Sequence, residues 1–342
     1  NVKRYKLSKD GSGNPLIVDK NGNAAIDDTT GFFRNSASSF WSVEDGSDVA
    51  KGGVAGRLLN PDTRKIFTWT AADRTPSASA GVTGSQALDI AAHRLITGNT
   101  AVTQAMLGAS TNTLRTNFIN WARGKKTDGT NRLAIADVLH NEPKLVAYVT
   151  DEDLARVNNS PATSTEKLFM FFGSNEGFIH AIDPTTGDEK FAFIPKELLG
   201  NPGNYLSDAK GSSNKKYGID GQINLWTEYR TPTADDIASK KRTLNKAYLY
   251  AGMRRGGSNY YSLDVTNIDA PAFKWLIKGA YAATPTPGFE KLGLTFSAPK
   301  LADIKINGTK TKVLIFSGGY DKEQDNIGTN VPKNDSVGNS LF

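Results

Sequence analysis

The sequence contains no cysteine among its 342 residues. This absence excludes disulfide-stabilised scaffolds, zinc ribbons, iron–sulfur sites and thiol catalysis. No apolar run approaches the roughly 20 residues that a membrane-spanning helix needs. No signal peptide opens the chain either, because Asn1–Tyr5 has the character of a strand. We therefore expect no membrane-spanning segment in this chain, and an export signal would lie upstream of it.

Catalytic motifs are also missing. The sequence has no G-x-S-x-G elbow, no P-loop and no H-E-x-x-H pattern. The three histidines, His93, His140 and His180, have no partner at metal-binding spacing, so we interpret each as structural. The glycine-rich Gly252–Gly257 joins two expected strands, which predicts a hairpin turn with two exposed arginines rather than a phosphate cradle. The sequence thus predicts no catalytic residue, no bound organic cofactor and no enzyme.

Charge gives little support for nucleic-acid binding. The net charge is +6, from 41 basic and 35 acidic residues that are mostly interspersed, and no basic stripe carries interleaved aromatics. Hydrophobic residues make up 38% of the chain, which is enough for a sizeable core. The 33 glycines and 14 prolines favour many turns, and therefore many short strands.

Three apolar runs of similar composition each end at a glycine: Leu168–Gly173, Ala247–Gly252 and Val313–Gly318. The first two continue in the same way, as a strand, a turn containing Asp and Thr, and a further strand. A unit of this kind, repeated with variable loops, predicts an all-β fold, namely a β-propeller. A two-sheet sandwich is the alternative. The turn Asp183–Gly187 favours propeller blades, since it follows the docking motif of quinoprotein propellers.

The domain organisation expected from these patterns is a single partial propeller spanning residues 1–342. Helix-forming residues dominate Ser85–Arg123, so we expect two helices in a helical insertion at about 85–124. A long loop rich in Gly, Ser, Asn and Lys is expected at about 201–246. Residues 1–70 have the character of hairpins with loops.

The first candidate metal site is the loop from Asp19 to Asp27. Oxygen-bearing side chains occur there at offsets 0, +2, +4 and +8, and a backbone carbonyl near Ala25 adds a further ligand. Ca²⁺ binds six to eight oxygen ligands, often from alternate positions of a short loop. The other interpretation is a plain hairpin with Asn21-Gly22 as its turn. The candidate ligands are Asp19, Asn21, Asn23, Ala25 and Asp27.

A second candidate calcium loop contains Asp321, Glu323 and Asp325, with Asp335 ten residues further on. Three neighbouring carboxylates repel one another, so they need a cation or exposure to water. An exposed acidic loop is the alternative.

The order of many short segments resembles the C-terminal propeller of the PilY/PilC family of type IV pilus proteins. The resemblance covers nearly the whole chain, and the following segments carry it: Asp27, Thr30–Phe33, Ser39–Ser42, Trp121–Gly124, Asp137–His140, Phe172–Asp183, Thr186–Gly187, Phe191, Phe193–Pro195, Glu197–Leu199, Tyr217–Gly221, Gly252–Gly257, Tyr260–Thr266, Leu292–Pro299 and Gly318–Asp321.

The resemblance implies an exported, non-enzymatic pilus factor. Such proteins support pilus assembly, oppose retraction, and act as adhesins at the pilus tip or outer membrane. Expected partners are pilins or minor pilins and a host or abiotic surface ligand. The family uses a D-x-D-x-D-x-x-x-D calcium loop, whose spacing Asp19, Asn21, Asn23 and Asp27 match with Asn at two positions. The family also continues into a further blade where this chain stops at Phe342, so we expect an incomplete propeller.

Two other functions are compatible with propeller-like strands. A quinoprotein dehydrogenase would need a cofactor-binding funnel, and the adjacent cysteine pair of many such enzymes cannot exist here. A carbohydrate-binding or carbohydrate-hydrolysing propeller would need groups that face one another across a pocket.

Overall fold

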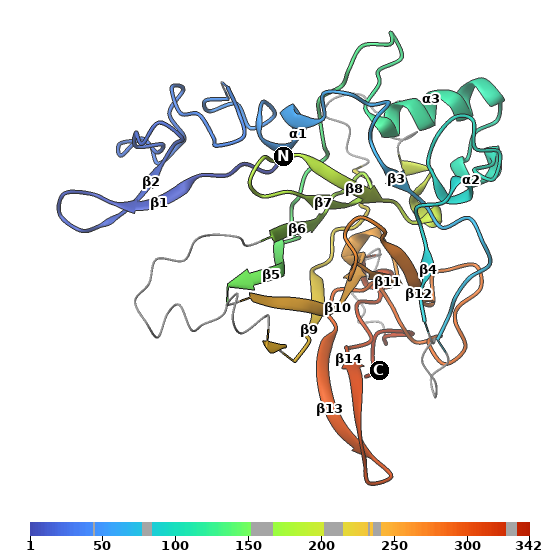
Figure 1. Ribbon diagram of the computed structural model, residues 1–342. Coiled ribbons are helices and arrows are strands. Elements are labelled where there is room, and N and C mark those ends of the chain that lie inside the picture. The colour runs from blue at the N-terminus through green and yellow to red at the C-terminus, as the bar shows by residue number, and fades with distance from the viewer. Residues whose placement is uncertain are drawn as a thin grey trace.

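The computed structural model describes residues 1–43, 45–76, 84–151, 167–201, 215–231, 233–234, 241–325 and 334–342. Strands dominate this part of the chain, and its helices are short and lie mainly to one side (Figure 1). None of the described helices is long and apolar enough to span a membrane.

Two antiparallel four-stranded meanders form the centre of the molecule. The first consists of β5 (Lys144–Asp151), β6 (Lys167–Gly173), β7 (Ile179–Ile182) and β8 (Glu189–Phe193). The second consists of β9 (Ile223–Tyr229), β10 (Lys241–Gly252), β11 (Asn259–Asp264) and β12 (Ala272–Lys278). The start of β10 pairs with the end of β5, so the two meanders belong to one sheet.

Shorter strands extend this sheet at both edges. β3 (Ile66–Phe67) runs parallel to β8, and β4 (Gln86–Ala87) runs antiparallel to β12. Two separate hairpins project from the sheet region (Figure 1). They are β1 (Lys6–Lys9) with β2 (Pro15–Val18), and β13 (Lys300–Ile306) with β14 (Thr309–Ile315).

The mostly β architecture predicted from the sequence is confirmed. β6 and β10 end at Gly173 and Gly252, as the apolar runs indicated, and each is followed by the two further strands of its unit. In the third run, β14 ends at Ile315, ahead of Gly318. The strands of the described residues close no barrel or propeller ring, so the propeller itself stays a proposal.

Of the two helices expected at about residues 85–124, one forms and the other does not. The second expected helix forms as α3 (Asn112–Arg123), which begins after the capping side chain of Thr111 and ends at the left-handed Gly124. The first does not form. Its residues make β4, the extended Ile90 and the 3₁₀ turn η1 (Ala91–His93), because β12 provides pairing partners that an isolated sequence window does not show.

The remaining helical elements are single turns. They are α1 (Gly53–Arg57), α2 (Gln104–Leu107), η2 (Lys196–Leu198), η3 (Arg254–Gly256) and η4 (Lys322–Asp325).

The expected long loop at about 201–246 is wrong in part, since β9 and the beginning of β10 lie inside it. Part of the expected loop falls outside the described residues. The alternating segment Ile223–Tyr229 pairs along β10, and Leu225 of that segment packs against the core. The composition of residues 201–246 is polar on average, so it did not reveal the strand at Ile223–Tyr229. The assignment of the chain to a single domain is still a prediction.

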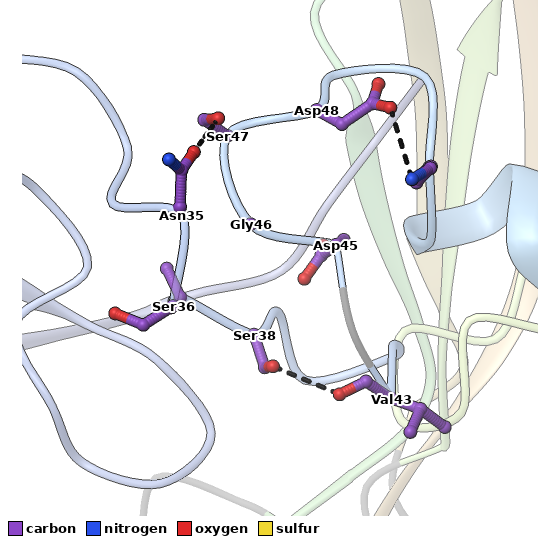
Figure 2. Close-up of a pocket in the computed structure, with 10 residues that line it drawn as sticks. Asn35, Ser36, Ser38, Val43, Asp45, Gly46, Ser47 and Asp48 are labelled. Atoms are coloured by element: carbon purple, nitrogen blue, oxygen red, sulfur yellow. Dashed lines mark hydrogen bonds and ion pairs between the residues drawn. The ribbon is translucent and has the colours of Figure 1, made fainter.

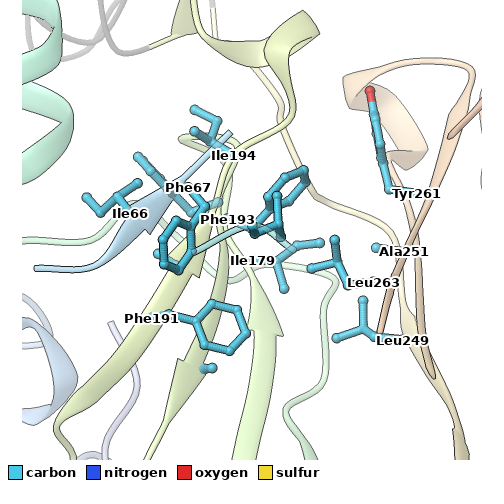
Figure 3. Packing of buried hydrophobic residues seen from close by; sticks show 14 of the residues in the cluster. Ile66, Phe67, Ile179, Phe191, Phe193, Ile194, Leu249, Ala251, Tyr261 and Leu263 are labelled. Carbon is cyan, nitrogen blue, oxygen red and sulfur yellow. The ribbon is translucent and has the colours of Figure 1, made fainter. Parts of the chain in front are cut away.

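The main core lies between the two meanders. Buried side chains of β3, β7 and β8 meet those of β10 and β11 in one cluster (Figure 3). Phe191 and Phe193 of β8 are 1% and 0% exposed, and Phe191 lies 6.2 Å from Phe67 between ring centroids. The turn before β8 is an Asx turn, in which the Asp183 carboxylate accepts from the backbone N–H of Thr185.

The turns that end the strands touch one another through backbone atoms. A Cβ built on Gly256 would lie 2.0 Å from the carbonyl oxygen of Gly218, and one on Gly319 would lie 2.1 Å from that of Leu294. Gly319 also has a φ of +86°, which disfavours any other residue. The chain therefore needs glycine at these crossings.

Candidate functional site

The first candidate calcium loop is a hydrogen-bonded hairpin turn. Asp19 is 2% exposed, and its Oδ1 accepts from the backbone N–H groups of Asn21 and Asn23 at 2.9 and 3.0 Å. The other carboxylate oxygen lies 3.3 Å from the backbone nitrogen of Ser38. Gly22 takes the positive φ of the turn. Both Asp19 oxygens therefore face N–H donors.

The other end of this loop is also occupied by protein donors. The carboxylate of Asp27 accepts from the backbone N–H groups of Thr29 and Thr30, and it lies 3.5 Å from a guanidinium nitrogen of Arg34. The carbonyl of Ala25, the expected backbone ligand, accepts from the backbone N–H of Arg34. These contacts hold the loop in its hairpin shape.

The second candidate loop has a carboxylate at its centre that holds protein segments together. Asp321 is 3% exposed and accepts from the Tyr281 hydroxyl at 2.8 Å, from the backbone N–H of Glu323, and from both the backbone N–H and the hydroxyl of Ser336. Burial alone would raise the pKa of Asp321, but these donors outweigh it and lower the pKa. Asp325 accepts from the hydroxyl of Tyr320.

Each candidate calcium loop is held by hydrogen bonds to its own carboxylates. In the part of the chain that the structure describes, no three His, Asp or Glu side chains converge on a point that could hold a metal. Calcium at Asp19, Asn21, Asn23, Ala25 and Asp27, or at Asp321, Glu323 and Asp325, is therefore still a prediction.

Thermal unfolding with calcium and with a chelator tests the calcium prediction. If the first loop binds calcium, we expect the ion to raise Tm, because ligands that bind only the folded state stabilise it. Asp19→Asn should abolish that increase, and Asp10→Asn, in a similar turn of the β1–β2 hairpin, should retain it. Identical thermal unfolding curves with calcium and with the chelator would contradict calcium binding.

A buried polar network lies at the sheet face between β7 and β8. The ring of His180 contacts Glu189 through Nδ1 at 2.9 Å and the hydroxyl of Ser174 through Nε2 at 3.2 Å. Arg64 pairs with the same carboxylate through two nitrogens, at 2.7 and 2.9 Å. Burial would raise the pKa of Glu189, but the Arg64 charge and the His180 hydrogen bond lower it to about 2.

This network has the order of a serine–histidine–carboxylate triad but no access for a substrate. Ser174 and His180 are both 0% exposed. The backbone N–H of Ser174 donates to the carbonyl of Phe178 within the β6–β7 turn. A nucleophile must reach its substrate to react. We therefore interpret the network as a structural one that stabilises the fold.

The histidines have partners that the sequence did not indicate. His140 Nδ1 lies 3.0 Å from both carboxylate oxygens of the buried Asp220, and His93 Nδ1 lies 2.9 Å from the Thr70 hydroxyl. The contacts of His93 and His180 agree with the expectation of structural histidines, whereas the His140 side chain is 36% exposed. The carboxylate partner of His140 is 80 residues away in sequence, so no spacing rule could have found it.

A polar cleft of about 620 Å³ lies near the N-terminal hairpin. Figure 2 shows its walls, with the Asp45 carboxylate facing the space between the two chain segments. The Oδ2 atom of Asp45 lies 3.3 Å from Lys3 Nζ without hydrogen-bond geometry, and Oδ1 accepts from the backbone N–H of Ser39. Because the ammonium of Lys3 already balances Asp45, the cleft gives no support for a cation site.

Comparison with known proteins gives one significant curated relative. The chain is 28% identical, over 157 residues, to a protein described as a type IV pilus biogenesis factor PilY1 homolog of Xylella fastidiosa. The match covers 46% of this chain and only 11% of that protein. The resemblance that the sequence segments indicated is thereby confirmed. The chain corresponds to a small part of that relative's length.

The other comparisons add little. No family model matches the chain. Among solved structures, the crystal structure of the Pseudomonas aeruginosa PilY1 C-terminal domain aligns with 23% identity over 48% of this chain and 28% of that chain. Its TM-score is 0.30, which is too low for the alignment to support an argument about the fold.

Proposed function

We propose that this chain is part of a type IV pilus biogenesis factor and that it acts by binding protein partners, without catalysis. The observation that carries the proposal is the 157-residue similarity to a protein described as such a factor. Among the described residues, the Ser174–His180–Glu189 network is buried and gives no support for acyl-transfer chemistry at that place. The expected partners are pilins or minor pilins.

The finer parts of the proposal concern architecture and place. Each of the two meanders is a four-stranded antiparallel unit, and we propose that they are two blades of a β-propeller. The protein would be exported through the periplasm to the pilus tip or outer membrane, and would bind a host or abiotic surface as an adhesin. Calcium bound at one of the two acidic loops would modulate that binding.

Counting surface pili tests the proposal in the organism that encodes the protein. Deleting the gene should strongly reduce surface pili and twitching motility, and additional loss of the retraction motor should restore pili, because the factor supports extension against retraction. A deletion strain carrying the intact gene is the control. Normal pili in the deletion strain would contradict the proposal.

A further inference from the structure

A second pocket lies where the turns before and after the central strands meet. It has a volume of about 510 Å³ and is lined by Val138–Pro143 ahead of β5, Gln222 ahead of β9, Arg254 in the β10–β11 turn, and Phe296. Its walls thus come from both meanders, so the fold and not one loop determines its shape.

The His140 ring is held in one orientation at this pocket. Its Nδ1 lies 3.0 Å from both oxygens of Asp220, whose side chain is 0% exposed, and Gln222 donates to the His140 carbonyl. Nδ1 donates to this carboxylate, which leaves Nε2 as the ring nitrogen available to a ligand. The side chain is 36% exposed, and Nε2 bonds to no described residue.

Arg254 differs from the exposed turn arginine that the sequence predicted. Its φ of 50° is in the left-handed region, which costs an L-residue roughly 1–2 kcal/mol. Its guanidinium lies 4.9 Å from the centroid of the Phe296 ring. Strain of this kind at a non-glycine residue is typical of functional sites.

The guanidinium of Arg254 also has unused hydrogen-bonding capacity. Nη1 is buried and lies 3.7 Å from Asp220, a distance that permits ion pairing but not a hydrogen bond, and it has no hydrogen-bond partner among the described residues. A buried donor without a partner is costly. An anionic ligand in the pocket would satisfy it. The nearby Glu142 does not compete, because it pairs with Lys144 at 2.9 Å.

We propose that this pocket binds an acidic side chain of a protein partner. The carboxylate pairs with the planar guanidinium of Arg254, which suits carboxylates geometrically. Nε2 of His140 hydrogen-bonds to the partner's backbone beside that side chain, and Phe296 provides the apolar wall. The choice of a protein partner rests on the proposed function, whereas the carboxylate chemistry rests on the pocket alone.

Binding of a minimal probe tests the proposal on the chain itself. Acetyl-aspartate N-methylamide is titrated against the folded protein while side-chain nitrogen resonances of His140 and Arg254 are followed by NMR. We expect saturable shifts of both. The matched neutral probe, acetyl-asparagine N-methylamide, should bind at least about ten-fold more weakly, because a hydrogen bond to a charged group is lost.

Variants distinguish the site from a general charge effect. Arg254→Gly removes the guanidinium and relieves the left-handed backbone, so we expect affinity to fall about ten- to hundred-fold while Tm stays equal or rises. The neighbouring Arg255→Ala is the matched control and should bind as the parent does. Equal affinity in the parent and in Arg254→Gly, or no binding in the parent, would overturn the proposal.

Glucuronate serves as the third probe. If it binds more tightly than the aspartate derivative, the assignment to a protein partner is wrong. Pilus counts do not enter this experiment, so failure of the pocket and failure of the proposed pilus function are observed separately.

Discussion

Gly319→Ala is expected to destabilise the protein by about 3–5 kcal/mol, and at 37 °C to leave little folded material. The new methyl group would lie 2.1 Å from the Leu294 carbonyl oxygen, and the backbone there has a φ of +86°. Because the obstructing atom belongs to backbone, no side-chain rotation can relieve the contact. Urea unfolding measures the loss.

The matched control for this variant is Gly308→Ala. Gly308 has nearly the same φ, +81°, but a Cβ there meets nothing within 4 Å. Only the conformational cost applies at that position, so we expect about 1–2 kcal/mol. The difference between the two losses of unfolding free energy gives the cost of the steric clash alone. Similar losses in both would show that the turns do not touch as described.

The second large effect is expected at the buried ion pair of Arg64 and Glu189. Glu189→Leu should cost about 3–5 kcal/mol, because it leaves the Arg64 guanidinium, 6% exposed, without its carboxylate. Arg64→Met should cost a similar amount. The double variant should lose less than the sum, since neither uncompensated charge remains. Unfolding free energies from urea titration provide this comparison.

The exposed pair Arg57–Asp188 provides a control with the same chemistry. Its atoms are 2.7 Å apart, but the side chains are 37% and 49% exposed. Asp188→Asn should therefore change the free energy of unfolding by less than about 1 kcal/mol. A loss as large as that of Glu189→Leu would mean that burial is not the cause of the effect.

The buried pair of Arg64 and Glu189 also predicts that the stability of the fold depends on pH. The pKa of Glu189 is about 2 in the folded protein, below the ordinary value of 4.5. A depressed carboxyl pKa stabilises the fold above the unfolded value, and this contribution is lost as pH falls through the folded value. The parent should therefore lose stability between about pH 4.5 and about pH 2 more steeply than Glu189→Gln.

Local patterns predicted the features that depend on neighbouring residues. The apolar runs before Gly173 and Gly252 gave β6 and β10, because burial on both faces selects continuous apolar strands. The turn at Asp183 depends on the carboxylate of that residue, which bonds within the turn itself. The helix-forming residues that precede Arg123 predicted α3, which carries its own caps.

Features made by distant residues were not predictable in this way. Arg64 reaches Glu189 across 125 positions, and His140 reaches Asp220 across 80. The helix expected near Ile90 failed because β12 offers hydrogen bonds to β4 that outweigh local propensity. The oxygen spacing of Asp19–Asp27 suits calcium and a hydrogen-bonded turn equally, so composition alone could not separate them.

The β13–β14 hairpin has a consequence for the protein in concentrated solution. Within the described residues its two strands pair only with each other, so their outer backbone groups could template association between molecules. Ile304 and Ile306 are exposed on the hairpin, which adds to this tendency. The net positive charge of the same strands opposes it by mutual repulsion, since four lysines face the single carboxylate of Asp303, which pairs with Lys310 and Lys312. Colloidal stability should thus depend on ionic strength, because dissolved salt screens the repulsion that keeps these edges apart.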